Sequence, residues 1–143
     1  MPEIEQKLDP MTLCRSGPEI DIVIARPEEV QVPAGAGSVS SQIDVRALID
    51  TGSDYCLIRS SLAERLALQK VDEKEFGNST GVELCDLFMV DVILPGVGSR
   101  TTYEVAGASF REQSLEFVLG RNFLMDTTFL YDGVRGTFKI TLS

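Results

Sequence analysis

Residues 46–53 read Arg-Ala-Leu-Ile-Asp-Thr-Gly-Ser. The apolar run from Ala47 to Ile49 ends at Asp50, which predicts a buried strand that carries a carboxylate at its end. Burial raises the pKa of a carboxyl group and suits it to acid/base chemistry. Gly52 then lets the backbone turn sharply. The same residues also fit an ordinary exit from a strand into a turn, because Asp, Thr, Gly and Ser all favour turns.

The composition excludes several kinds of catalytic and metal site. The chain contains no histidine, which rules out Ser-His-Asp and Cys-His nucleophilic arrangements and zinc sites that need imidazole. Cys14, Cys56 and Cys85 are odd in number and far apart, so they indicate neither a disulfide framework nor a metal knuckle. We interpret them as buried or idle thiols in a reducing compartment. No calcium-loop spacing occurs among the acids, and we expect neither a metal nor a cofactor.

Charge and length narrow the class of protein further. The chain has 22 acidic and 13 basic residues, a net charge of -9, which argues against a nucleic-acid or anionic-membrane surface. Its 143 residues fit one domain with a sizeable core. No apolar run approaches the roughly 20 residues that span a bilayer, and residues 1–13 do not resemble a signal peptide. We therefore expect a cytoplasmic protein that binds no membrane.

The hydrophobic pattern predicts mostly strands. Residues 1–18 read as an irregular arm and residues 19–143 as one domain. Apolar alternation or short apolar runs predict strands over residues 20–24, 43–49, 55–58, 91–94, 101–105, 115–119, 129–132 and 137–142, and a hairpin over residues 75–88. Ser61 and Glu64 form a capping-box pattern that predicts a helix to about Leu68. Residues 33–41 form a small-residue loop without the lysine of a phosphate-binding loop. Strand density this high predicts a small all-β barrel or sandwich with one or two short helices.

A second informative stretch lies near the end of the chain. Residues 115–120 form another apolar run that stops at a glycine, Gly120, and Arg121-Asn122-Phe123-Leu124 follows as a short helix. A buried strand, a one-turn helix and a terminal hairpin account for this stretch by themselves. However, two apolar strands that each stop at a small-residue turn recur on either side of a hairpin that contains glycine.

Together, Ala-Leu-Ile-Asp-Thr-Gly-Ser at 47–53, the hairpin and Phe-Val-Leu-Gly-Arg-Asn at 117–122 resemble the retropepsin-like aspartic proteases, over roughly residues 43–142. The resemblance implies a small closed barrel of the acid protease type. It implies that Asp50 is the catalytic carboxylate and that the Thr51 hydroxyl bonds across a dimer axis. Gly52 and Ser53 would complete the active-site loop beneath the substrate.

The resemblance also implies supporting residues and a flap. Asp54 and Arg121 match two family positions whose side chains pair in retroviral relatives, which predicts a structural salt bridge. Gly120 and Asn122 match the rest of the second motif. The flap that closes over a peptide would be formed by Asn78, Ser79, Thr80 and Gly81, a tip that departs from the glycine-rich retroviral version. In retroviral relatives the termini interleave at the dimer interface, for which residues 137–142 are the candidate here.

The chemistry explains why one Asp in each chain suffices. Peptide hydrolysis by this route needs two carboxylates that share one proton, so that one activates water and the other protonates the carbonyl oxygen. The chain offers one Asp-Thr-Gly, and a two-fold axis supplies the second. We therefore expect a homodimeric aspartic endopeptidase that acts on extended peptides. The alternative is a retropepsin-like domain with little or no activity that serves as a dimerisation or peptide-binding module.

Other acids and the thiol nearest the motif receive no catalytic role. Asp91, Asp126 and Asp132 read as exposed turn or strand-edge acids, because none follows an apolar run and precedes Thr-Gly. Cys56 lies six residues after Asp50 and lacks a base partner, so it is a poor candidate for a nucleophile.

Overall fold

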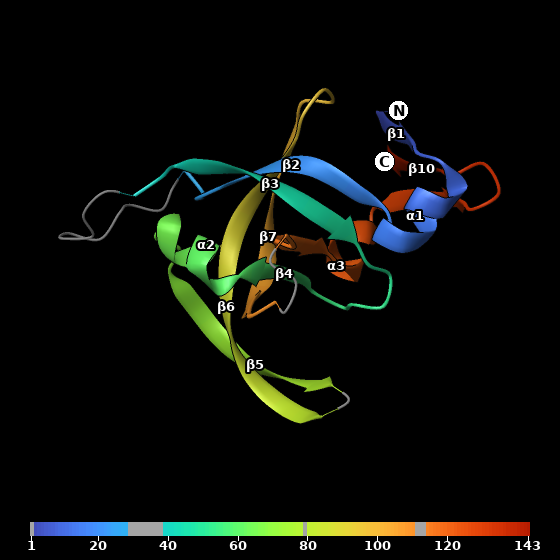
Figure 1. Ribbon diagram of the computed structural model, residues 1–143. Coiled ribbons are helices and arrows are strands. Elements are labelled where there is room, and N and C mark those ends of the chain that lie inside the picture. The colour runs from blue at the N-terminus through green and yellow to red at the C-terminus, as the bar shows by residue number, and fades with distance from the viewer. Residues whose placement is uncertain (1, 29–38, 79, 111–113) are drawn as a thin grey trace.

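The computed structural model describes residues 2–28, 39–78, 80–110 and 114–143. Six strands form a closed barrel (Figure 1). In order around the barrel, they are β2 (Glu19–Ala25), β3 (Gln42–Ile49), β8 (Phe117–Leu119), β4 (Cys56–Arg59), β7 (Ser99–Ala108) and β6 (Gly81–Leu94). Pairing between β2 and β6 closes the barrel. The prediction of a small closed all-β barrel is confirmed.

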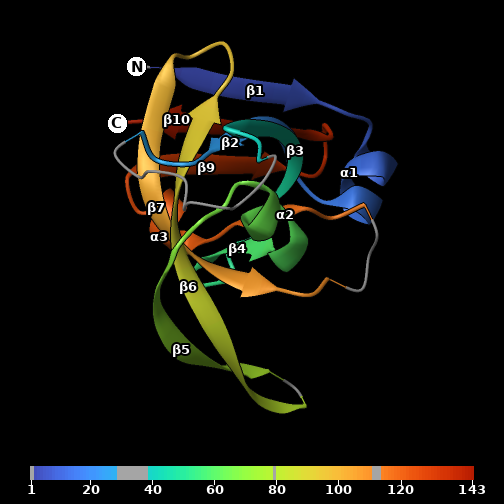
Figure 2. The ribbon, with the colours of Figure 1, turned by 90° about the vertical axis from the view of Figure 1, so that its left-hand side faces the viewer.

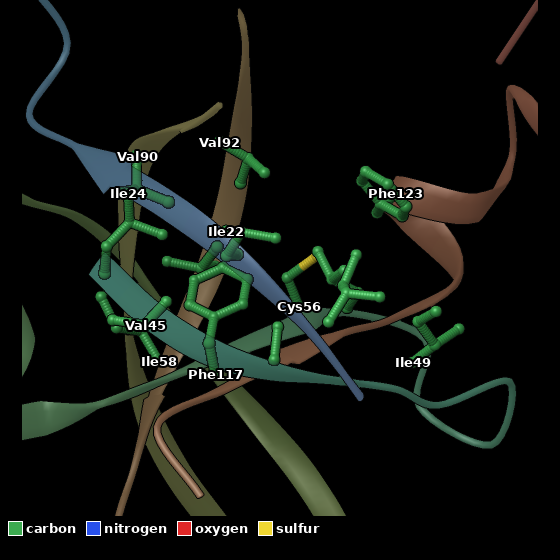
Figure 3. Close-up of a cluster of buried hydrophobic side chains, with 14 of the residues drawn as sticks. Ile22, Ile24, Val45, Ile49, Cys56, Ile58, Val90, Val92, Phe117 and Phe123 are labelled. Carbon is green, nitrogen blue, oxygen red and sulfur yellow. The ribbon is translucent and has the colours of Figure 1, made fainter. Parts of the chain in front are cut away.

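The core follows the alternation of the strands. Ile43, Val45, Ala47 and Ile49 of β3 point inward, as the sequence pattern predicts, and the intervening residues lie nearer the surface. Ile22 and Ile24 of β2 and Phe117 of β8 fill the barrel interior from other sides (Figure 3). Burial of one such side chain contributes about 1.5–3 kcal/mol to folding. The buried face of β3 therefore fixes its register and the direction in which it leaves the barrel.

Two of the short helices connect barrel strands to the rest of the fold. Helix α2 (Ser60–Arg65) follows β4 directly, with Arg59 as its N-cap and no side-chain capping bond. The predicted capping box at Ser61 and Glu64 is therefore wrong, because the helix follows the strand directly and its N-cap lies two residues earlier than predicted. Leu62 and Ala63 of the helix and its C-cap residue Leu66 are buried. Helix α3 (Arg121–Leu124) lies where the sequence predicts it.

Residues 1–18 are not an irregular arm. They contain strand β1 (Glu3–Lys7) and helix α1 (Pro10–Ser16). The helix has a clear start signal, because Asp9 accepts a hydrogen bond of 2.9 Å from the Thr12 amide and Pro10 occupies the first turn. Strand β1 is mostly exposed and lacks an apolar face. A pairing partner distant in sequence holds it extended, and no local pattern reveals such a partner.

A separate three-stranded sheet lies beside the barrel (Figure 2). Strands β9 (Thr127–Asp132) and β10 (Thr137–Leu142) form the predicted terminal hairpin, and β1 pairs with the other side of β10. The order is therefore β1-β10-β9, with β10 in the centre. The C-terminal strand expected to interleave with a partner has no free edge.

Two predicted segments lie partly outside the described residues. They are residues 33–38 of the predicted loop at 33–41 and Ser79 of the predicted flap tip. Strand β5 (Lys70–Asn78) pairs only with β6 and extends away from the barrel as one arm of the predicted hairpin (Figure 2). The hairpin is longer than residues 75–88, because β5 begins at Lys70 and β6 continues to Leu94. Within the described residues, no helix is long and apolar enough to cross a membrane.

Asp91 differs from the prediction of an exposed acid. It lies within β6, is only 6% exposed, and pairs in register with Thr102 of β7. Its carboxylate accepts a hydrogen bond of 2.7 Å from Arg100 Nε and another from the Thr102 hydroxyl. Burial of an ionised carboxylate is tolerated only with such partners. The partners come from the neighbouring strand, which the spacing around Asp91 does not reveal.

Replacement of Asp91 by alanine should lower the free energy of unfolding by about 2 kcal/mol, because the Arg100 guanidinium loses its hydrogen-bonded anion. Chemical denaturation of both proteins measures this difference. Asp21→Ala is the matched control, since Asp21 pairs with Arg46 at the surface and exposed pairs contribute about 0–1 kcal/mol. Equal losses in the two variants would contradict a structural role for the buried pair.

Candidate active site

Asp50 stands at the rim of the barrel, immediately after β3. Strands β3 and β8 run parallel, with Ile49 beside Leu119, and the Asp50 amide continues this pairing with a 3.0 Å bond to the Leu119 carbonyl. Its carboxylate accepts a 2.8 Å hydrogen bond from the Gly52 amide. Asp50 is half-buried, so its carboxylate is fixed in orientation and still reachable from one side.

The residues after Asp50 form a tight turn around its carboxylate. The Ser53 amide donates to the Asp50 carbonyl over 3.2 Å, and the Ser53 hydroxyl donates to the Tyr55 carbonyl over 2.7 Å. A Cβ at Gly52 would lie 3.1 Å from Asp50 Oδ1, too close for the carboxylate to keep its position. Thr51 is exposed. The turn thus presents Asp50 and Thr51 on the outside of one chain.

The second motif, residues 120–122, hydrogen-bonds to this turn and packs closely against it. The Arg121 amide donates to the Ser53 carbonyl over 2.7 Å, and the Asn122 amide donates to the Asp54 carbonyl over 3.2 Å. Gly120 approaches the loop so closely that a Cβ there would lie 2.3 Å from the Tyr55 carbonyl oxygen. The two segments that carry the sequence motifs therefore contact each other through their main chains.

The side chain of Asn122, in α3, joins two strands at this point. Its Oδ1 accepts a 2.8 Å hydrogen bond from the Cys56 amide of β4, and its Nδ2 donates over 2.8 Å to the Glu104 carbonyl of β7. Both functional ends of the amide are used. Asn122 is therefore a structural residue of the site, which accounts for its place in the motif.

The predicted ion pair between Asp54 and Arg121 is not formed in this chain. The structure describes both residues, both are exposed, and the ion pairs of the described residues do not include them. Arg121 Nη1 instead donates to the Thr51 carbonyl over 2.7 Å. Arg121 thus supports the loop after β3 through a backbone oxygen, and an exposed ion pair would add little stability.

The β5–β6 hairpin packs against the loop after β3 through residues that the motifs do not reveal. The rings of Tyr55 and Phe76 meet edge to face, with centroids 5.5 Å apart. Lys74 Nζ lies 4.4 Å from the Tyr55 centroid and 5.5 Å from that of Phe76. The only sequence signal is Tyr55 itself, an aromatic residue that follows the loop directly.

The tip of the same hairpin contains the predicted flap residues. Asn78 pairs in register with Gly81, and Thr80 lies in the turn between them. Gly81 has a φ of +136°, a conformation that a residue with a side chain rarely adopts. The two strands thus meet at the predicted place. A flap function for Asn78, Ser79, Thr80 and Gly81 stays a prediction.

Cys56 lies in the core beneath the loop. It is fully buried, and burial raises the pKa of its thiol to about 11. A thiol with this pKa is protonated at neutral pH and is a weak nucleophile. Among the described residues, no group of three or more Cys, Asp or Glu side chains is placed to hold a metal ion.

A family model matches most of this chain. Residues 36–126 match the family model described as "gag-polyprotein putative aspartyl protease". A comparison with curated proteins finds no significant match.

Three solved structures are similar to this chain at low sequence identity. A retropepsin-like aspartic protease from Rickettsia conorii is 14% identical, with 87% of this chain and 92% of that chain covered and a TM-score of 0.48. The EIAV protease, complexed with an inhibitor, is 20% identical, with coverage of 76% and 86% and a TM-score of 0.46. The simian foamy virus protease is 12% identical, with coverage of 57% and 81% and a TM-score of 0.44.

Gly120→Ala should lower the free energy of unfolding by about 2–3 kcal/mol, because the new methyl group would displace the Tyr55 main chain. Thermal or chemical unfolding measures the loss. Gly77→Ala is the control, since a Cβ at Gly77 meets no atom within 4 Å. A Gly120→Ala protein as stable as the control variant would show that the two motifs do not need their close approach.

Proposed function

Since the chain belongs to the family of gag-polyprotein, retropepsin-like aspartyl proteases, we propose that it is an aspartic endopeptidase that acts as a homodimer. The observation that carries the proposal is the loop at Asp50. Its carboxylate is held by the Gly52 amide at the rim of the barrel, and the motif at 120–122 braces the loop from below. Such a loop holds a carboxylate in a fixed direction, which acid/base catalysis needs.

The proposed reaction uses one Asp50 from each of two chains. The ionised carboxylate takes a proton from a water molecule, whose oxygen attacks the peptide carbonyl carbon. The protonated carboxyl group gives its proton to the carbonyl oxygen, and the tetrahedral intermediate then collapses with a proton passed to the leaving amine. Repulsion between two ionised carboxylates favours the state in which the pair shares one proton.

The proposed substrate is an extended peptide held between the active-site loop and the β5–β6 hairpin. An extended peptide supplies its own main-chain donors and acceptors to such a hairpin, in the manner of an added strand. The contact between Phe76 of the hairpin and Tyr55 supports this placement, because it holds one hairpin arm against the segment that follows the Asp50 turn. The flap role of residues 78–81 is part of the same proposal.

Wild-type protein, incubated with an unbiased peptide library from about pH 4 to 7, should cleave peptides, and Asp50→Asn should reduce the rate at least about 10³-fold. Mass spectrometry identifies the cleavage products, and pepstatin inhibition provides supporting evidence. Asp126→Asn is a matched control that replaces an exposed acid outside the site. Absence of cleavage by a sample shown to be dimeric would favour the peptide-binding module over the enzyme.

Asp50→Asn should also raise the thermal stability of the dimer at neutral pH. Two carboxylates held close together repel each other, and relief of about 1 kcal/mol corresponds to roughly 3 °C in Tm for a domain of this size. The asparagine oxygen can still accept the hydrogen bond from the Gly52 amide. A fall in Tm, measured by calorimetry at a concentration that keeps both proteins dimeric, would indicate that Asp50 only stabilises the turn.

A further inference from the structure

Strand β6 changes its partners partway along its length. From Leu87 to Leu94 it pairs with β7, whereas from Gly81 to Asp86 it pairs only with β5 within the described part of the chain. Strand β7 instead continues beside β4. Figure 2 shows the β5–β6 hairpin and the end of β7 diverging from each other. One edge of β6, over residues 81–86, is therefore left vacant and can serve as a template for another strand.

The main-chain groups of alternate residues face this vacant edge. The Asp86 carbonyl oxygen lies 3.7 Å from the position that a Cβ at Gly107 of β7 would occupy, and the Leu94 carbonyl accepts a 3.4 Å hydrogen bond within the β6–β7 turn. Even-numbered residues of β6 therefore face the side on which β7 lies, because alternate residues of an antiparallel strand turn to the same neighbour. Val82 and Leu84 thus present their amides and carbonyls to the vacant side.

Apolar side chains flank the same edge. Val82 is 69% exposed and Leu84 is 60% exposed, and both point away from the face of the hairpin that packs toward the loop after β3. Val82 lies opposite Gly77, which has no side chain to cover it. Residues 81–86 contain no lysine, arginine or proline, which are residues that commonly protect an edge from pairing. The edge is therefore open to an added strand.

A hollow of about 170 Å³ lies in the fork between the two diverging strands. It is lined by residues 83–86 of β6, by residues 107–109 at the end of β7 and by Ser60 of α2. A side chain at Gly107 would fill part of it, because a Cβ there would lie 3.1 Å from Phe88 Cε2. The hollow can therefore receive a side chain from a strand that pairs with β6.

The charge around this edge is negative. Glu83 and Asp86 line the hollow, and Glu73 and Glu75 lie on the neighbouring strand β5. Lys70 forms ion pairs with Asp86, over 3.3 Å, and with Glu73, so carboxylates outnumber cations here. Lysine and arginine side chains complement such a surface. A second copy of this chain, with its net charge of -9, does not.

We propose that the edge of β6 over residues 81–86 binds an extended basic segment of another protein, which adds a third strand to the β5–β6 hairpin. Main-chain groups of the segment bond to Val82 and Leu84, and its apolar side chains cover theirs. A lysine or arginine of the segment occupies the hollow beside Glu83 and Asp86. The inference goes beyond the proposed function, because neither the active-site carboxylate nor peptide cleavage enters it.

A short synthetic peptide of alternating lysine and valine tests this surface by isothermal titration calorimetry. The protein is the Asp50→Asn variant, so that cleavage does not interfere. The peptide should bind at least about tenfold more tightly than a peptide of alternating glutamate and valine, and than its own fully N-methylated form, which keeps the charges but cannot donate main-chain hydrogen bonds. Absence of binding, or equal affinity for the N-methylated peptide, would overturn the proposal.

Amide hydrogen exchange, followed by NMR, locates the bound peptide. At saturation with the peptide, the amides of Val82 and Leu84 should exchange at least about 100-fold more slowly than in the free protein. The amides of Glu73 and Glu75 face the outer edge of β5, by the same alternation, and their exchange should not change. Protection of the β5 amides in place of the β6 amides would show that the peptide binds the other edge, and would overturn the proposal.

Proline substitutions provide the matched variants. Val82→Pro removes one outward amide of β6 and should raise the Kd for the basic peptide at least about tenfold. Gly77→Pro makes the same change in the residue opposite, at the outer edge of β5, and should leave the Kd unchanged. Circular dichroism checks folding. If Val82→Pro does not fold, Glu83→Gln combined with Asp86→Asn should raise the Kd in its place. An unchanged Kd in the folded variant overturns the proposal.

Discussion

The parallel pairing of β3 with β8 is the contact on which the site depends. It brings together the ends of two strands that are about seventy residues apart in the chain, so that Ile49 lies beside Leu119. The turns that follow them then meet, and the bonds from Arg121 and Asn122 to the loop carbonyls become possible. Parallel strands cannot be joined by a tight hairpin. The β5–β6 hairpin and β7 lie within the long connection between them.

The close approach of the two turns restricts which residues can occupy them. Only a glycine at position 120 allows the Tyr55 carbonyl so near, and only a short polar turn after Asp50 lets the Gly52 amide reach back to its carboxylate. Carbonyls of the loop accept hydrogen bonds from Arg121 and Asn122. The Asp50 carboxylate is therefore left on the accessible side of the loop. The motif is therefore recognisable in sequence because its geometry tolerates few residue types.

The features predicted from sequence are those whose causes are local. Alternation in β3 identifies its buried face, and the small-residue turn after it identifies Asp50. The burial of Asp91 depends on Arg100 and Thr102 across a strand pair, and β1 depends on β10. Contacts between residues distant in sequence leave no periodicity to read. The start of α1 is different, because Asp9 and Pro10 are a local signal that the pattern of charges around them obscured.

The same distinction applies to the residues of the site. Sequence motifs locate Asp50, Gly120 and Asn122, because the close approach at Gly120 and the hydrogen bonds at the other two residues allow few residue types. The partner of Arg121 is decided by the folded chain, in which the Thr51 carbonyl lies within 2.7 Å of its guanidinium. Likewise, the contact of Tyr55 with Phe76 arises only when the hairpin folds back beside the loop.

Electrostatic repulsion opposes the association of two such chains. Each copy has a net charge of -9, and the proposed site adds two carboxylates that must approach closely. Salt screens charges more than about 8 Å apart at physiological ionic strength, so the long-range repulsion is weak and the short-range cost remains. Apolar contact and main-chain pairing must supply the opposing free energy.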